Sequence, residues 1–150
     1  KDLINDDRPL IIANSDQYIK WNPNEIMYSF INKEVDGGIL TFNSTHPKWS
    51  YAKTNESGFV TEVAEKNPIS NFATVGIYYW KKGSDYVKYA EEMIEKDIRV
   101  NNEFYVCPVF NEAIRDNKKI IINEIKKDGM WGIGTPEDLN YFLKNYNHEL

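Results

Sequence analysis

The sequence lacks several features that would point to a secreted or membrane protein. Its only cysteine is Cys107, so no disulfide can form within the chain. No apolar run approaches the roughly 18 residues that a membrane-spanning helix needs, and no secretion signal is recognisable at its start. We therefore expect a soluble, cytoplasmic protein without a membrane partner.

Basic residues are also too few and too scattered for binding to a polyanion. The chain has 18 Lys and Arg against 23 Asp and Glu, which gives a formal net charge of −5. Its lysine doublets are short and lie beside predicted strands, so no basic patch forms and we expect no nucleic-acid partner. His46 has no other histidine or cysteine near it in sequence, which favours a surface loop residue over a metal ligand.

What the sequence does contain is one domain's worth of chain with both strand and helix patterns. A length of 150 residues can bury a sizeable core without cross-links. Alternating or continuous apolar runs predict strands at 9–13, 38–42, 49–54, 58–64, 73–80 and 119–125. Helical spacing and start signals predict helices after Asn22, after Gly83, around Phe110 and after Thr135. The pattern predicts an α/β fold.

Three local predictions bear on how the chain is arranged. Residues 1–8 are charged and lack a period, so we expect a linker or frayed end. The run 9–13 is apolar enough to be buried in a parallel sheet. The last helix has Thr135 as N-cap and Pro136 in its first turn, and it should bury one stripe of side chains, namely Leu139, Phe142, Leu143 and Tyr146.

The stretch from Phe59 to Trp80 has two strands on either side of a charged pair, Glu65 and Lys66. A carboxylate and an ammonium at the end of a strand can hold a ligand that carries hydroxyl and phosphate groups. Most such pairs are solvated surface residues, so the pair alone leaves both interpretations open.

Asp16 lies where the first predicted strand ends, within the polar sequence Asn-Ser-Asp-Gln. The carboxyl edge of an open α/β sheet is where ligands bind, so Asp16 is a candidate metal ligand. An aspartate at such a position also commonly caps a helix or stabilises a turn, and position alone does not separate the two.

Three segments together resemble the sugar-phosphate nucleotidyltransferases, the pyrophosphorylases with a glycosyltransferase-A-like fold that make nucleotide sugars. PLIIANSDQYI is similar to the family strand that ends in a metal-binding aspartate. EVAEKNPISNFATVGIYYW resembles the family's Glu-Lys-Pro segment and following Gly-Ile-Tyr strand, and MWGIGTPEDLNYFL resembles its closing Gly-Thr-Pro segment and helix. The resemblance implies a three-layer α/β fold around a mixed, mostly parallel sheet.

The resemblance also implies a reaction and residue roles. Nucleotidyl transfer from a nucleoside triphosphate to a sugar phosphate, with pyrophosphate released, would serve surface polysaccharide precursor synthesis. Lys66 would bind the sugar phosphate and Glu65 its hydroxyl groups, with Gly76 close to the sugar and Asp16 holding Mg²⁺. The acceptor phosphate is itself the nucleophile, so no serine, cysteine or histidine nucleophile is required.

Two departures from the family pattern limit these expectations. No glycine-rich loop with basic residues precedes Asp16, so residues 1–150 resemble the C-terminal part of a single nucleotidyltransferase domain without its nucleotide-binding part. Gly132 stands where the family usually has a second metal-binding aspartate. Either Asp16 binds the metal together with water, or Asp128 or Glu124 supplies the missing ligand, or the protein binds its ligand without catalysing a reaction. The alternative function is therefore a non-catalytic sugar-phosphate-binding or regulatory module. We also expect little activity from this chain alone, and association with another copy through an unpaired sheet edge.

Overall fold

The fold combines a central sheet of six strands with a separate two-stranded sheet, as seen in a computed structural model that describes residues 1–146. The strands are β1 Leu10–Ala13, β2 Gln17–Ile19, β3 Gly37–Asn43, β4 Ser50–Thr54, β5 Val60–Glu65, β6 Phe72–Trp80, β7 Ile120–Glu124 and β8 Met130–Gly132. The helices are α1 Pro23–Asn32, α2 Gly83–Glu95, α3 Val109–Arg115 and α4 Pro136–Asn145, with a 3₁₀ turn at Lys127–Gly129. The predicted α/β class is confirmed.

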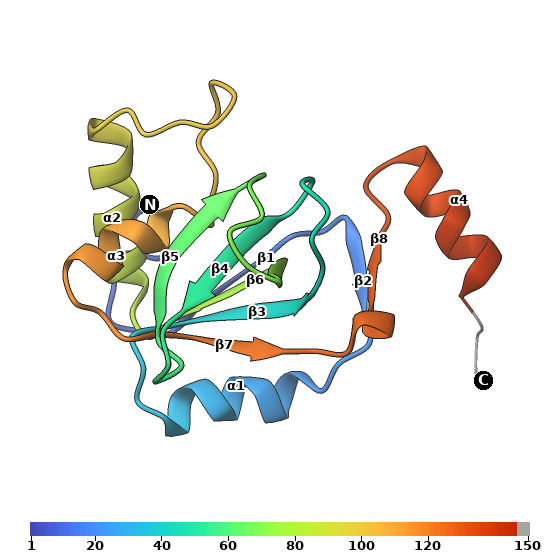
Figure 1. Ribbon diagram of the computed structural model, residues 1–150. Coiled ribbons are helices and arrows are strands. Elements are labelled where there is room, and N and C mark those ends of the chain that lie inside the picture. The colour runs from blue at the N-terminus through green and yellow to red at the C-terminus, as the bar shows by residue number, and fades with distance from the viewer. Residues whose placement is uncertain (147–150) are drawn as a thin grey trace.

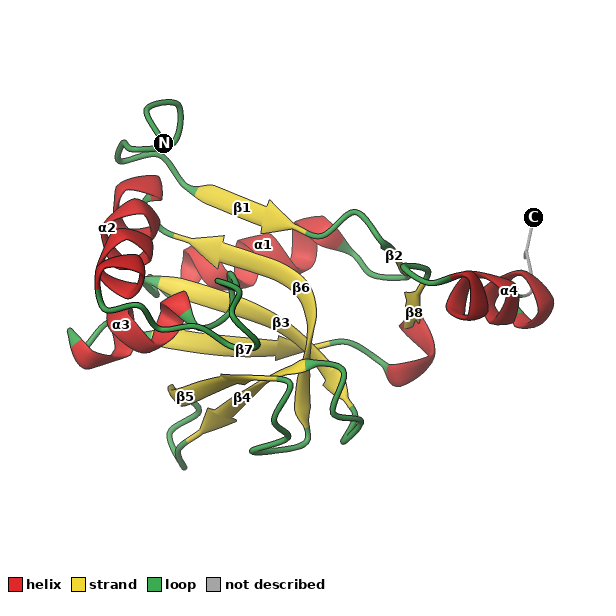
Figure 2. Cartoon of the chain, turned by 90° about the horizontal axis from the view of Figure 1, so that it is seen from above, coloured by secondary structure: helices red, strands yellow, loops and turns green. Residues whose placement is uncertain are grey.

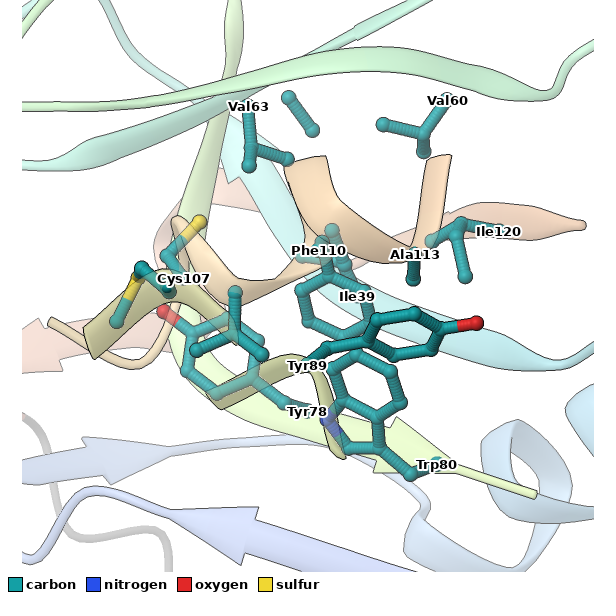
Figure 3. Packing of buried hydrophobic residues seen from close by; sticks show 13 residues of the cluster. Ile39, Val60, Val63, Tyr78, Trp80, Tyr89, Cys107, Phe110, Ala113 and Ile120 are labelled. Atoms are coloured by element: carbon teal, nitrogen blue, oxygen red, sulfur yellow. The ribbon is translucent and has the colours of Figure 1, made fainter. Parts of the chain in front are cut away.

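Helices cover both faces of the central sheet, which gives three layers (Figures 1 and 2). On one face Phe30 of α1 stacks on Tyr79 of β6, with ring centroids 5.6 Å apart. On the other face Trp80 of β6 stacks on Phe110 of α3 at 4.2 Å, within the cluster drawn in Figure 3. Successive residues of β6 thus face opposite layers, and its apolar sequence on both faces follows from this burial.

The sheet is mixed, but most of its strand pairs are antiparallel, which corrects the expectation of a mostly parallel sheet. Only β3 and β7 pair in parallel among the described strands of this sheet. A short loop joins β4 to β5, and neighbouring strands joined in this way run antiparallel. β4 also runs antiparallel to β6 on its other side. The run 9–13 forms β1, antiparallel to β6, and its Ile11 side chain is half exposed, so this strand is not fully buried.

Residues 1–8, expected to be a linker, pack against the start of α2. The N-cap of α2, Lys82, makes no capping bond with its side chain. The Gly83 amide instead donates to the Arg8 carbonyl and the Ser84 amide to the Asp6 carbonyl, both at 2.9 Å. The N-terminal segment therefore satisfies helix amides that would otherwise lack partners.

The chain also contains a small antiparallel ribbon that the sequence did not predict. β2 pairs with β8, with Tyr18 opposite Trp131. Each strand has only three residues, too few for an alternating pattern to be detected. This ribbon carries the chain from the central sheet to α4 (Figure 1).

Helix α4 begins as predicted but does not bury the predicted stripe. Thr135 caps it by accepting a hydrogen bond from the Asp138 amide at 3.1 Å. Phe142 and Tyr146 pack against the β2–β8 ribbon, whereas Leu139 and Leu143 are 40% and 64% exposed. Because α4 stands away from the central sheet (Figure 2), within residues 1–146 it packs mainly on this ribbon. Within residues 1–146, no helix has both the length and the apolar character needed to span a membrane.

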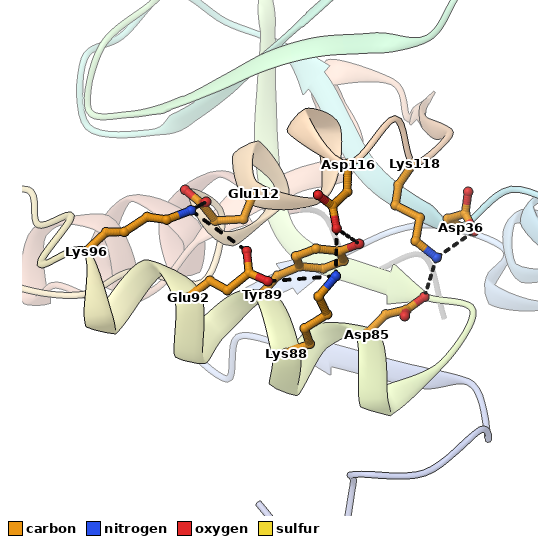
Figure 4. Close-up of polar contacts among 9 residues, drawn as sticks. All are labelled: Asp36, Asp85, Lys88, Tyr89, Glu92, Lys96, Glu112, Asp116 and Lys118. Carbon is orange, nitrogen blue, oxygen red and sulfur yellow. Dashed lines mark hydrogen bonds and ion pairs between the residues drawn. The ribbon is translucent and has the colours of Figure 1, made fainter.

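A buried carboxylate joins α2 to α3. Glu112 of α3 is almost fully buried and accepts a hydrogen bond from Lys96 at 2.5 Å (Figure 4). It accepts a second hydrogen bond from Arg115. Burial alone would raise the pKa of Glu112, but these two bonds lower it overall. Further ion pairs in the same region are Lys88–Asp116, Lys118–Asp85 and Lys118–Asp36.

Replacing Glu112 by glutamine is expected to lower the free energy of unfolding at pH 7 by about 1–3 kcal/mol, because two charge-assisted hydrogen bonds are weakened. Since the folded-state pKa of Glu112 is lowered, its contribution is present above the ordinary glutamate pKa and is lost as the pH falls through the lowered value. Urea unfolding at pH 7 and pH 3 should show a difference between the two proteins that shrinks at pH 3. An equal difference at both pH values would contradict this account.

Candidate functional site

Strands β1 and β4 pair with the same edge of β6 and diverge where β6 bends. The second half of β6 pairs with β1, from Ala13 opposite Ile77 to Leu10 opposite Trp80, while β4 pairs with β6 at Ala73. Between these two regions lies Gly76, whose φ of 77° is in the left-handed region, and the β3–β6 register shifts there. The bend opens a gap between the end of β1 and the start of β4.

This gap forms a cleft of about 460 Å³ lined by segments that are far apart in the sequence. The loop after β1, the loop before β4, the end of β5, the bend of β6, the loop before α3 and the segment from β8 to α4 all contribute. All four residues predicted to form the site line it: Asp16, Glu65, Lys66 and Gly76. The structure therefore brings the predicted residues together, while their roles remain predictions.

Lys66 lies at the turn that follows β5. Its φ of 53° is left-handed, and its amide donates to the Trp49 carbonyl at 3.0 Å. The ammonium donates to the Tyr105 hydroxyl at 2.6 Å and lies 4.7 Å from the centre of that ring. The hydrogen bond to Tyr105 raises the pKa of Lys66, so the side chain is a persistent cation at the cleft.

Glu65 faces the same cleft from the last position of β5. Its carboxylate accepts a hydrogen bond from the Ser50 hydroxyl. Burial raises the pKa of Glu65, and the Ser50 bond and the charge of Lys66 oppose this effect without cancelling it. A carboxylate with one protein donor keeps further lone pairs for hydroxyl groups of a ligand.

Asp16 packs its carboxylate against the segment that leads into α4. The backbone carbonyl of Asp16 accepts a hydrogen bond from the Ile133 amide at 2.9 Å. A Cβ atom at Gly134 would lie 2.6 Å from the Asp16 carboxylate, so this close approach requires glycine. Asp16 and the Gly-Thr-Pro segment, which carry two of the three resemblances, are therefore in contact.

The described residues provide only part of a metal site. No group of three or more His, Cys, Asp or Glu residues within 1–146 is placed to hold an ion. Gly132 lines the cleft without an oxygen ligand, and Asp128 and Glu124 line a separate hollow beside α1. Of the four positions considered for the metal, Asp16 alone brings a side-chain oxygen to the cleft, which suits Mg²⁺ only if phosphate oxygens and water complete its shell.

Sequence reasoning missed several residues of the cleft. Lys48 forms an ion pair with Asp138 at 3.1 Å and lies 4.7 Å from the centre of the Trp49 ring. The hydrogen bond from Lys48 lowers the pKa of Asp138. Lys48 and Asp138 are 90 residues apart, and Tyr105 is 39 residues from Lys66, so no local pattern could have joined them.

The inner wall of the cleft contains an aromatic ring and a thiol that is not a nucleophile. Tyr78 and Cys107 line this wall, and the Tyr78 hydroxyl bonds the Thr74 hydroxyl at 3.1 Å. Burial raises the pKa of the Cys107 thiol to about 12, so the thiol stays protonated and unreactive at neutral pH. The described groups at the cleft are suited to binding and charge stabilisation rather than to covalent catalysis.

Comparison with known proteins identifies matches along almost the whole chain. A family model described as nucleotidyl transferase matches residues 1–148. A nucleoside-diphosphate-sugar pyrophosphorylase structure from Vibrio cholerae RC9 matches with a TM-score of 0.79 and 25% identity, covering 91% of this chain and 56% of that one. A Bacillus anthracis protein assigned as a glucose-1-phosphate thymidylyltransferase, solved with sucrose, matches with a TM-score of 0.71 and 17% identity, covering 99% and 59%.

The chain thus spans less than two thirds of the length of either of these solved structures. No curated protein sequence gives a significant match.

Proposed function

Because the chain belongs to the nucleotidyl transferase family, we propose that the full-length protein transfers a nucleoside monophosphate from a nucleoside triphosphate to a sugar phosphate. An oxygen of the acceptor phosphate attacks the α-phosphorus, and pyrophosphate leaves with the electrons of the broken P–O bond. The observation that carries this proposal is the meeting of Asp16, Glu65 and Lys66 along one cleft.

The acceptor occupies the part of the cleft formed by β5, β6 and the loop before α3. The Lys66 ammonium holds the acceptor phosphate and stabilises its charge as it approaches a second polyanion. The Glu65 carboxylate accepts hydrogen bonds from sugar hydroxyl groups. Gly76 lies beside the sugar at the bend of β6, where Asn14 fills the space that a side chain of residue 76 would take.

The nucleotide is bound largely by residues outside this chain. This part of the proposal is supported by partial coverage, since the matches span 56% and 59% of the two solved chains. Asp16 would hold Mg²⁺, which neutralises phosphate charge when it is bound. Within residues 1–146 the second edge of β1 has no strand partner, so a further strand of the same polypeptide or of another copy can add there.

Nucleotide sugars are the activated donors for polysaccharide assembly, and nucleoside triphosphates are cytoplasmic. We extend the proposal to a cytoplasmic step in the synthesis of surface polysaccharide precursors. The enzyme assay is pyrophosphate release by the full-length protein with Mg²⁺, a panel of nucleoside triphosphates and a panel of sugar 1-phosphates. Release with at least one pair is expected, and no release with any pair would overturn the catalytic proposal.

Gly132 favours a second candidate, a module that binds a sugar phosphate without catalysis. The usual second metal-binding aspartate is replaced by a residue without a side-chain oxygen. Under this alternative, calorimetry of the full-length protein would detect sugar 1-phosphate binding while no pair of substrates releases pyrophosphate. Release together with binding would exclude it.

The raised pKa of Glu65 predicts that binding of the acceptor depends on pH. Its raised pKa means that the carboxylate gains a proton at a higher pH than a free glutamate does. Affinity for a sugar 1-phosphate should therefore fall as the pH is lowered through that value, because a protonated Glu65 accepts fewer hydrogen bonds from hydroxyl groups. In the Glu65→Gln variant, calorimetry from pH 7.5 to pH 5 should show weaker binding at pH 7.5 and a flatter profile. An unchanged profile would assign the pH dependence to another group.

A further inference from the structure

A second lysine approaches the cleft beside Lys66. Lys48 lies in the loop before β4, and the next residue, Trp49, accepts the backbone hydrogen bond from Lys66 at 3.0 Å. The two lysines are therefore attached to backbone segments that are bonded to each other. Both side chains line the same cleft.

Each ammonium has a different kind of partner. Lys66 donates to a neutral hydroxyl, that of Tyr105, whereas Lys48 pairs with the Asp138 carboxylate. The Lys48 and Asp138 side chains are 42% and 33% exposed, and ion pairs this accessible to water contribute little to stability. A doubly charged phosphate can compete for Lys48 at small cost to the fold.

The space next to this ion pair is not filled by a side chain of residue 132. A Cβ atom at Gly132 would lie 3.4 Å from Trp49 and 4.0 Å from the Asp138 carboxylate. A side chain extending from that position would enter the region between them. With glycine there, the Lys48 ammonium can turn from Asp138 toward a ligand in the cleft.

We propose that Lys48 is a second phosphate-binding residue of the cleft, with Asp138 as the counterion that holds it until a phosphorylated ligand arrives. This inference rests on the proposed function and deepens it. Lys48 and Lys66 then contact the same polyanion from two adjacent turns, and Asp138 limits the affinity for phosphate by competing for Lys48. The ligand class is a sugar or other small metabolite that carries a phosphate group.

Variants of the two ion-pair partners should have opposite effects on phosphate binding. In calorimetry of the full-length protein with glucose 1-phosphate, Lys48→Met is expected to weaken binding about tenfold, the effect of losing one charge-assisted hydrogen bond. Lys48→Arg should retain most of the affinity. Asp138→Asn should tighten binding about threefold, because the ammonium no longer has a competing carboxylate. Inorganic phosphate should follow the same order, and glucose should not.

If the ion pair only stabilises the structure, Lys48→Met and Asp138→Asn should change the affinity for phosphate in the same direction. That result, or unchanged binding in Lys48→Met, would overturn the inference. Lys53→Met, at an exposed lysine of β4, is the matched control, and thermal melting checks that each variant is folded. If Lys66→Met also leaves phosphate binding unchanged, the proposed function fails as well; if it abolishes binding while Lys48→Met does not, only the role of Lys48 is wrong.

Discussion

Replacing Lys66 by methionine is expected to lower kcat/KM for the sugar phosphate by about 10²- to 10³-fold, the usual effect of removing one charge-stabilising donor from an active site. Methionine keeps a similar length and apolar stem but removes the ammonium that donates to Tyr105. Residues 66–71 contain no other lysine or arginine, and Lys48 on the neighbouring loop is paired with Asp138. The measurement is pyrophosphate release by the full-length protein across a range of sugar 1-phosphate concentrations.

Two further variants test whether the effect comes from the charge of Lys66 itself, from the Tyr105 hydroxyl, or from the loss of any lysine. Tyr105→Phe keeps the ring beneath the ammonium and removes only the hydroxyl, so it should fall between wild type and Lys66→Met. Lys53→Met should behave as wild type, since Lys53 is exposed on β4 away from the cleft. Undiminished release in Lys66→Met would show that the phosphate is bound elsewhere.

Replacing Gly76 by alanine is expected to have the largest effect on stability, about 3 kcal/mol, because two costs add. A residue with a Cβ atom is strained at a φ of 77°, and that atom would lie 2.3 Å from the Asn14 side chain. Urea unfolding measures the loss. Because the bend at Gly76 separates β1 from β4, sugar-phosphate binding should weaken as well.

Gly58 provides a matched control, since it has a similar φ of 82° but open space, with no neighbouring atom within 4 Å, where a Cβ atom would lie. Gly58→Ala should therefore cost about 1 kcal/mol, the backbone strain alone. Adding Asn14→Ala to the Gly76→Ala variant should restore the stability lost to the clash with Asn14. The loss from backbone strain should remain. Equal losses at Gly76 and Gly58 would mean that Asn14 moves away without cost.

The elements with strong local signals were predictable from the sequence. Start signals at Asn22 and Thr135 correspond to caps seen in the structure. The direction of strand pairing was not predictable in the same way, because the apolar run 9–13 is compatible with either a parallel or an antiparallel neighbour.

The exposure of α4 could not be predicted from the periodicity of its apolar residues either. An apolar stripe at helical spacing predicts a face that can be buried, and it does not say whether a partner element is present. Leu139 and Leu143 have the expected spacing, but α4 packs mainly on the β2–β8 ribbon, itself too short to predict.

The grouping of the site came from resemblance and not from local pattern. Asp16 and Lys66 are separated by strands and helices, and only the order of three family-like segments suggested that they meet. The structure places both on one cleft, and it adds Tyr105 and the Lys48–Asp138 pair, which arise from contacts between distant segments. The left-handed φ of Gly76, at the bend of β6 that lines this cleft, likewise has no sequence signature beyond the glycine itself.

The most direct test is a crystal structure of the full-length protein with a sugar 1-phosphate and a non-hydrolysable nucleoside triphosphate. The account predicts the sugar phosphate in the cleft between β1 and β4, with a phosphate oxygen within hydrogen-bond distance of the Lys66 ammonium and sugar hydroxyl groups on Glu65. A sugar phosphate bound elsewhere, for example in the hollow beside α1 that Asp128 and Glu124 line, would contradict it.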